Sequence, residues 1–182
     1  MFTASEFIIR APHSLSHFTI FHVVCILRII TKESTMIVLG IESSCDETGL
    51  ALYSEEKGLI KHLVNSQIDL FTEYGGVIPE IAARDHSVKI VCILEELIED
   101  TGIGLNDIDL IAYTAGPGLI GSLVVGETVA KTISTLQDIE LLPMNHLEGH
   151  ILAPGLEENV IEPPYLCLLV SGGHTQIIEC KN

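Results

Sequence analysis

The sequence predicts an α/β fold in which a three-stranded meander is followed by helices that alternate with strands. Short apolar runs bounded by polar or glycine-containing turns are typical of strands. Three such runs follow one another closely, at residues 37–41, 49–53 and 58–67. Helical periodicity then covers residues 79–100, and two later apolar runs, 110–113 and 165–170, each end in small residues. This alternation of helices and strands after the meander predicts the α/β class.

Residues 1–35 differ from the rest of the chain. Their apolar run at 18–30 is interrupted by His22 and Arg28, and it is too short to span a bilayer, which takes about 20 apolar residues. It resembles a signal peptide weakly, but small-residue cleavage chemistry does not follow it. We interpret Met36 as the natural start and the preceding residues as an over-extended reading frame. The alternative is a membrane-associated or organelle-targeting leader.

Composition and charge limit the classes of protein to consider. Apolar residues make up 47% of the 182 residues, enough for a hydrophobic core without disulfides as staples. The five cysteines are odd in number and form no Cys-x-x-Cys pair, which favours a reducing cytoplasm. The formal net charge of −16 makes the chain a poor unaided binder of nucleic acid. If RNA is involved, another segment or a partner must supply the basic surface.

The turn at residues 42–48, between the first two strands, is unusually polar for a hairpin. Hairpin turns commonly use Asn-Gly or Gly-Gly pairs. This turn instead contains two serines, a cysteine and the acidic pair Asp46 and Glu47. Two interpretations stay open: a solvated surface turn, or a loop that faces a phosphate-bound metal ion.

Pro79 marks the start of a helix that follows a glycine-containing loop at 69–79, because proline is well suited to the first helical turn. Apolar residues recur at helical spacing and predict the buried stripe Ile90, Ile93, Leu94 and Leu97. Arg84, Asp85 and His86 lie near the start of this helix. We expect them on its solvated face, with a functional role as the alternative.

A buried strand at 110–113 runs into a glycine-rich turn at 115–118 and then a helix at 121–137. The predicted buried face of this helix consists of Val125, Val129, Ile133 and Leu136. Such a turn brings backbone N–H groups close to an anion at the helix N-terminus. Because it matches no established phosphate-binding pattern, tight packing of the strand on the helix explains it about as well.

The clearest candidate site is the segment HLEGH at residues 146–150, in a short helix that follows residues 141–144 and ends near residue 154. Histidines four residues apart lie on one face of a helix, where two neutral imidazoles can bind one divalent metal ion. A metal site needs a third protein ligand, so the alternative is a hydrogen-bonded pair without a metal. Glu148 points elsewhere on the helix, and the segment is not the His-Glu-x-x-His signature of zinc proteases.

The end of the chain predicts a second hairpin. An acidic loop at 157–164 precedes a buried strand at 165–170. Small residues after that strand, at 171–173, leave room for a ligand against the backbone. Residues 175–179 pair back onto the strand.

Five segments stand out together, namely MIVLGIESSCDETGLALY, YGGVIPEIAARDH, AYTAGPGLIGSL, HLEGH and LLVSGGHTQ. In this order and spacing they resemble the bacterial tRNA threonylcarbamoyladenosine transferase family, once described as glycoprotein endopeptidases. The resemblance runs from Met36 to about Glu179. It implies the actin, Hsp70 and sugar-kinase (ASKHA) fold, with two lobes around a nucleotide cleft. The first lobe is a mixed sheet with an N-terminal three-stranded meander and flanking helices.

The resemblance also implies an activity. The family transfers a threonylcarbamoyl group from threonylcarbamoyl-AMP to N6 of the adenosine beside the anticodon, in tRNAs that read codons beginning with A. His146 and His150 match its ligands of one divalent metal ion, with iron favoured and zinc as the alternative. Asp46 and Glu47 match acidic residues close to the reacting groups. The substrate-binding strand end corresponds to Leu169, Val170, Ser171, Gly172 and Gly173.

This chain departs from the family in one respect. Residues 36–182 match the first lobe only, whereas the family's third metal ligand, an aspartate, and much of its nucleotide site lie in a second lobe. Three hypotheses follow: a transferase completed by a second polypeptide, a truncated and inactive module that contacts pathway proteins including a degenerate paralogue, or a sugar-kinase or phosphatase-like relative. The HLEGH segment argues against the last, because kinases of this fold lack it. We expect a cytoplasmic protein without stable membrane association.

Overall fold

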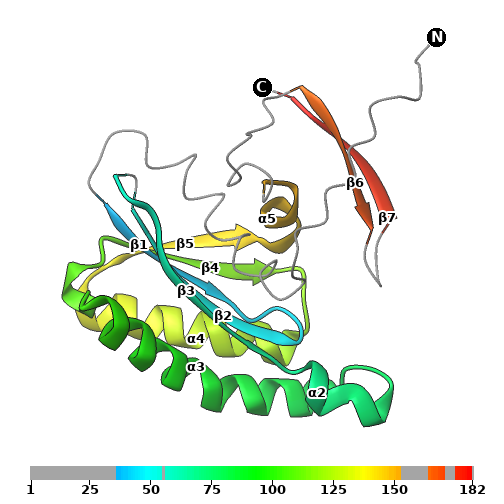
Figure 1. The fold of residues 1–182 in the computed structure, drawn as a ribbon, viewed down its shortest axis with the longest axis horizontal. Coiled ribbons are helices and arrows are strands. Elements are labelled where there is room, and N and C mark those ends of the chain that lie inside the picture. The colour runs from blue at the N-terminus through cyan, green and yellow to red at the C-terminus, as the bar shows by residue number, and fades with distance from the viewer. Residues whose placement is uncertain (1–35, 55, 153–163, 171–174, 182) are drawn as a thin grey trace.

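The computed structural model describes residues 36–54, 56–152, 164–170 and 175–181. A five-stranded sheet forms its centre, in the order β3-β2-β1-β4-β5 (Figure 1). The strands are β1 (Ile37–Glu42), β2 (Glu47–Ser54), β3 (Gly58–Ser66), β4 (Leu110–Gly116) and β5 (Glu140–Asn145). The first three pair antiparallel, and β1, β4 and β5 pair parallel. The predicted meander and the mixed sheet are confirmed.

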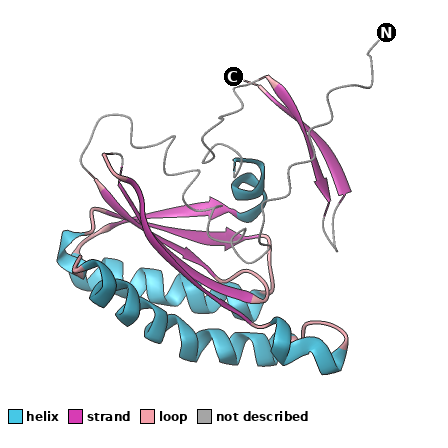
Figure 2. Ribbon diagram, in the orientation of Figure 1, coloured by secondary structure: helices cyan, strands magenta, loops and turns pink. Residues whose placement is uncertain are grey.

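Two long helices, α3 (Pro79–Thr101) and α4 (Ile120–Gln137), lie side by side along one face of this sheet (Figures 1 and 2). Shorter elements are α2 (Ile68–Phe71), α5 (His146–Leu152) and the 3-10 turns Thr72–Tyr74 and Leu105–Asp107. The α2 helix and the first 3-10 turn occupy a segment that we had expected to be a loop. Among the described residues, no helix is both long and apolar enough to cross a bilayer.

The main core lies between the sheet and these two helices. Its strand residues alternate along the chain, as the pleat requires, so that Leu39 and Ile41 of β1 face the helices while Val38 belongs to a cluster on the opposite face. The largest fully buried apolar side chains that the helices add to this core are those of Ile90 and Leu97. The central strand β1 is therefore covered on both faces, which fits its continuous apolar sequence.

The predicted limits of α3, residues 79 to about 100, are confirmed. Proline stands in its first turn, and Gly102 ends it with φ +67° and an N–H that donates to the carbonyl oxygen of Ile98 at 2.8 Å. Ile90, Ile93 and Leu97 are buried and Leu94 is partly buried, as expected. His86 corrects the expectation, because it is fully buried rather than on the solvated face.

The predicted buried face of α4 is confirmed in part, because Ile133 is buried but Leu136 is not. Leu136 is 75% exposed, and Val125 and Val129 are only partly buried against the core. The buried positions are mostly small: Ser122, Gly126, Ala130 and Ile133. A Cβ on Gly121 would lie 3.0 Å from the Cβ of Ala83 in α3. The helix therefore packs through a stripe of small residues, which turns the larger side chain of Leu136 towards solvent.

The sheet extends one strand further than the sequence predicted. Residues 140–145, expected only to lead into the histidine helix, form β5 and pair in parallel with β4. Pro143 lies inside this strand. It cannot donate a ladder hydrogen bond, but β5 is at the edge of the sheet, where one side of the strand needs no partner.

The strands β6 (Tyr165–Val170) and β7 (Thr175–Cys180) form the predicted antiparallel hairpin. They make a separate two-stranded sheet, which lies apart from the main sheet near α5 (Figure 1). The prediction that β6 is a buried strand is wrong. Leu166, Leu168 and Val170 are 73%, 54% and 66% exposed, and among the described residues of this strand only Leu169 is buried. A two-stranded sheet buries a face only where another layer covers it.

Candidate functional site

The candidate site lies where three neighbouring parallel strands end. Glu42 is the last residue of β1, Thr114 lies near the end of β4, and His146 follows directly after β5. The pairing of β4 with β5 shifts register between Thr114 and Gly116. Ligands of open α/β sheets bind beyond the carboxyl ends of the strands, which is this edge of the sheet.

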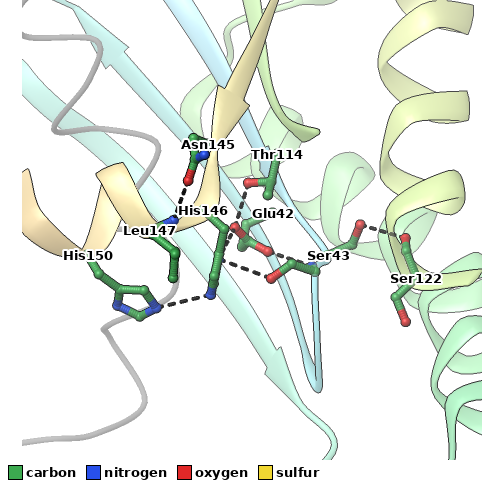
Figure 3. Close-up of polar contacts among 9 residues, drawn as sticks. Glu42, Ser43, Thr114, Ser122, Asn145, His146, Leu147 and His150 are labelled. Atoms are coloured by element: carbon green, nitrogen blue, oxygen red, sulfur yellow. Dashed lines mark hydrogen bonds and ion pairs between the residues drawn. The ribbon is translucent and has the colours of Figure 1, made fainter. Parts of the chain in front are cut away.

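Glu42 is the centre of a buried hydrogen-bond network (Figure 3). Its side chain is fully buried, and its Oε1 accepts from the backbone N–H of Ser44 at 2.5 Å. Its Oε2 lies 2.5 Å from the hydroxyl oxygen of Thr114, which donates to it, and 3.2 Å from Nδ1 of His146. Burial raises the pKa of this carboxyl group, but the interactions with His146, Ser44 and Thr114 outweigh it and lower the pKa to about 2. Glu42 is therefore ionised.

His146 and His150 lie on one face of α5, as the spacing predicted. Their Nε2 atoms are 3.0 Å apart, and the ring planes meet edge to face at 84° with centroids 4.5 Å apart (Figure 3). Burial, together with the nearby His146, lowers the pKa of His150 to about 4. His150 is therefore a neutral imidazole at physiological pH, and a metal ligand must be neutral.

The two histidines fit a shared metal ion. Two ligands of one tetrahedral zinc ion, each at about 2.0–2.1 Å, are separated by about 3.3 Å, close to the observed 3.0 Å between the Nε2 atoms. Metal-binding histidines usually donate a hydrogen bond from their other ring N–H to a carboxylate or carbonyl oxygen, and Glu42 stands in that position behind His146. Within the described ranges, no group of three or more His, Cys, Asp or Glu side chains is arranged to hold a metal.

The turn between β1 and β2 is held firmly in place. The carbonyl oxygen of Ser44 accepts from the N–H of Leu119 at 2.8 Å, and the hydroxyl of Ser43 donates to the carbonyl oxygen of Ser122 at 2.9 Å. A Cβ on Gly118 would lie 2.6 Å from the carbonyl oxygen of Ser44. The glycine-rich turn thus packs against the acidic turn.

His86 holds the same turn from the side of α3. Its Nε2 lies 3.1 Å from the carbonyl oxygen of Cys45, and its Nδ1 lies 2.7 Å from the hydroxyl of Thr48. A carbonyl oxygen can only accept, so we assign the proton to Nε2 and let the hydroxyl donate to Nδ1. Burial lowers the pKa of His86, although the Cys45 carbonyl and nearby carboxylates oppose the shift. A neutral histidine therefore joins the helix to the turn.

Three groups of the turn differ in their chemistry. Burial, Asp46 and Glu42 raise the pKa of Glu47 to about 7, which leaves this carboxyl group balanced between its two protonation states. Burial and Asp46 raise the pKa of the Cys45 thiol to about 11, so this exposed cysteine is a poor nucleophile. Asp46 is half-buried, and its carbonyl oxygen accepts from the N–H of Gln67 at 2.9 Å.

The predicted substrate residues lie on the β6–β7 hairpin. Leu169 is buried and Val170 is exposed, and Ser171, Gly172 and Gly173 lie outside the described residues. The hydroxyl of Tyr165 in β6 donates to the carbonyl oxygen of Ile151 at 3.2 Å, so the hairpin is tied to the histidine helix.

Sequence reasoning missed two residues of the site. On the sequence alone, Glu42 is counted with the polar turn. Its place at the end of a continuous buried strand does indicate a site, because a carboxylate that is buried there needs polar partners. His86 was assigned to a wet helix face, although it lies four residues before Ile90 and therefore on the buried side.

The sheet order, the pair of helices on one face and the site at the strand ends define an α/β lobe built on a mixed five-stranded sheet. A solved structure supports the fold. It is described as an uncharacterized protein with similarity to peptidase YeaZ from Pseudomonas aeruginosa, with a TM-score of 0.50 and 19% identity over 80% of this chain and 64% of that chain. YeaZ from Pseudomonas aeruginosa matches with a TM-score of 0.44 and 18% identity over 60% of this chain and 43% of that chain. The chain spans less than two thirds of either structure.

The sequence model of one family matches residues 58–182. That family is TsaD, described as tRNA N6-adenosine threonylcarbamoyltransferase. The match covers more than half of the chain, so the chain belongs to this family. The resemblance to this family is confirmed, and the family is described as one of tRNA-modifying transferases.

Proposed function

We propose that this chain provides the first lobe of an enzyme that transfers a threonylcarbamoyl group from threonylcarbamoyl-AMP to N6 of adenosine beside the anticodon. The observation that carries the proposal is the pair of Nε2 atoms 3.0 Å apart, supported by the buried carboxylate of Glu42, in a chain of this family. The same residues occupy the sheet edge where ligands of this class of fold bind.

In this proposal His146 and His150 hold one divalent ion, with iron favoured over zinc. A third, carboxylate ligand comes from a second lobe. When bound, the ion would supply positive charge for the phosphate of the adenylate and for the charge that develops as AMP leaves. Neutral imidazoles suit either metal, so the donor set does not select between them.

Asp46 and Glu47 are the proposed catalytic carboxylates. N6 of the adenosine forms a bond to the carbonyl carbon of the threonylcarbamoyl group, the bond from that carbon to the phosphate oxygen breaks, and AMP leaves with the electron pair. N6 loses one proton in the exchange. Glu47 is suited to accept it, because its pKa of about 7 lies near the operating pH.

The end of β6 is the proposed substrate-binding segment, with Leu169 and Val170 followed by Ser171, Gly172 and Gly173. In this proposal residues 36–182 correspond to the first lobe of the family, and residues 1–35 do not belong to the family match. The partners in the proposal are threonylcarbamoyl-AMP, tRNA and the other proteins of the pathway. A cytoplasmic location belongs to the same proposal and fits the unpaired thiols of the described cysteines.

A second candidate function is a non-catalytic module that binds pathway proteins, including a degenerate paralogue of the family. One observation favours it. Large apolar side chains are exposed along α3 and α4, among them Val88, Val91 and Val124 at 59%, 48% and 52%. Exposed apolar side chains that gather on neighbouring helices are typical of protein interfaces.

The two functions are separated by an assay for the modified nucleoside. The purified chain is incubated with tRNA, threonine, bicarbonate, ATP and the pathway proteins, with or without a separately produced second lobe, and tRNA nucleosides are analysed by mass spectrometry. We expect no product from the chain alone, because correct positioning is worth about 7–11 kcal/mol of barrier. We expect product when the second lobe is added, and its loss in His146→Ala but not in the exposed-residue control Glu148→Gln.

Two results would contradict this proposal. Failure of both lobes together to make the product, while the chain binds the pathway proteins, would favour the interaction module. Product from the chain alone that disappears in His146→Ala would show that one lobe is sufficient.

A further inference from the structure

We infer that Glu42 is a positioning residue that fixes the tautomer of His146, with the proton on Nδ1 and the lone pair of Nε2 directed at His150. The inference deepens the proposed metal site and rests on it for its purpose, although the tautomer itself is measurable without any metal. Four contacts at the end of β1 carry the argument.

The carboxylate of Glu42 accepts on both oxygen atoms. On one side, Oε1 faces the backbone N–H of Ser44 at 2.5 Å, a donor whose direction the chain fixes. On the other side, Oε2 faces the Thr114 hydroxyl at 2.5 Å and Nδ1 of His146 at 3.2 Å. The side chain is fully buried, so water does not replace any of these partners. Because Oε1 accepts from the Ser44 N–H and Oε2 accepts from the Thr114 hydroxyl, the carboxyl group faces His146 as an acceptor, and Nδ1 must donate.

The imidazole of His146 has two neutral tautomers, and this environment separates them. With the proton on Nδ1, the ring donates towards Oε2 of Glu42 and towards the hydroxyl oxygen of Ser44, which is 3.1 Å away. With the proton on Nε2, the lone pair of Nδ1 would face a buried anionic oxygen at 3.2 Å. Two lone pairs held against each other without solvent are unfavourable, so the first tautomer is selected.

The consequence appears on the other side of the ring. Nε2 of His146 is left with its lone pair, and it points at Nε2 of His150 at 3.0 Å. A metal ligand must offer a lone pair, so the selected tautomer prepares His146 to bind an ion at the point between the two rings. Glu42 does this without touching the ion.

The isosteric change Glu42→Gln gives a sharp test, because it should invert the tautomer. The Ser44 N–H requires an acceptor, so the amide oxygen takes the Oε1 position. The amide NH2 group then faces His146, to which it can only donate, while the Thr114 hydroxyl is able to rotate and accept. Nδ1 becomes the acceptor, and the proton of His146 moves to Nε2.

The measurement is ¹⁵N NMR of histidine ring nitrogens in the metal-free full chain. It is made across a series of pH values, and the tautomer is read at the alkaline end, where the ring signals no longer change with pH. Signals of His146 are assigned by their loss in His146→Asn. We expect the Nδ1–H tautomer in the wild type and in the matched control Glu148→Gln, whose glutamate is exposed on the same helix. We expect the Nε2–H tautomer in Glu42→Gln.

Zinc is then added to each protein, and the same signals follow its binding. Loss of an orienting partner typically weakens metal binding by about 10–100-fold, and we expect this in Glu42→Gln but not in Glu148→Gln. An Nε2–H tautomer in the wild type would overturn the inference. This measurement on the wild type remains valid even if Glu42→Gln fails to fold. An unchanged tautomer or unchanged zinc affinity in folded Glu42→Gln would overturn it as well. None of these readouts depends on tRNA modification, so failure of the proposed function is seen separately.

Discussion

The backbone of Gly118 lies directly against Ser44, so that a Cβ on this glycine would be 2.6 Å from the Ser44 carbonyl oxygen and 2.8 Å from its Cβ. The atoms in the way belong largely to the backbone of a turn that is hydrogen-bonded on several sides, so they cannot move cheaply. We expect Gly118→Ala to destabilise the chain by about 1–3 kcal/mol in urea unfolding. The control is Gly76→Ala, at an exposed glycine with open space around it, which should change stability by less than about 0.5 kcal/mol. Equal effects of the two changes would contradict this packing.

His86 should contribute strongly to stability although it lies outside the histidine pair. His86→Ala would leave the Thr48 hydroxyl and the Cys45 carbonyl without their partner and open a cavity beside α3. We expect a loss of about 2–4 kcal/mol in the free energy of unfolding. Lys89→Ala, at an exposed position of the same helix, should change it by less than about 0.5 kcal/mol. If both variants unfold alike, His86 does not hold the turn.

Glu47 should make stability depend on pH. Its pKa is about 7 in the folded chain and about 4.5 in the ordinary, unfolded case. As the pH rises above 4.5, the unfolded chain gives up this proton first, so stability falls until about pH 7 and then levels off. Glu47→Gln removes this contribution. Urea unfolding at several pH values should therefore show wild type losing stability relative to Glu47→Gln across that window, and parallel curves would contradict the raised pKa.

Metal binding by the chain alone should be weak. The two histidines supply two ligands, and a protein site for iron or zinc needs at least a third. We expect a second lobe added in trans to tighten zinc binding, and His150→Ala to abolish that gain. Competition titration with a chromophoric chelator measures both effects. Tight, stoichiometric binding by the chain alone, insensitive to changes at both histidines, would show that the ion binds elsewhere.

A chain that begins at Met36 should be as stable as the full chain. Ile37 already pairs with Ser54 at the start of β1, and its N–H donates to the carboxylate of Asp109 at 2.8 Å. Thermal unfolding compares the two. A melting temperature lowered by many degrees would show that residues 1–35 belong to the fold.

The parts of the fold that sequence predicts well are those set by neighbours in the chain. The meander, the ends of α3 and the common face of His146 and His150 follow from periods of two or about four residues and from proline and glycine at helix ends. These signals act over a few residues. A pattern within one segment is enough to find them.

The parts that sequence did not predict depend on contacts between distant segments. Glu42 meets Thr114 across 72 residues and His146 across 104 residues, and no local pattern contains that information. Leu136 continues the apolar period of α4 but is exposed, whereas the small residues Ser122, Gly126 and Ala130 are buried. The apolar residues of β6 likewise indicate that the strand is suited to burial. They do not indicate which segment packs against it.

The β6–β7 hairpin has a consequence for how long different parts of the site stay formed. An isolated two-stranded sheet is marginally stable, and no other described strand pairs with β6 or β7. Its local opening should therefore be far more frequent than that of β1, which has paired strands on both sides. In hydrogen exchange, the amides of β6 and β7 should exchange long before those of β1. The histidine pair is then attached to a sheet that opens only when the whole chain unfolds. The strand proposed to bind substrate, in contrast, opens and closes locally without unfolding of the main sheet.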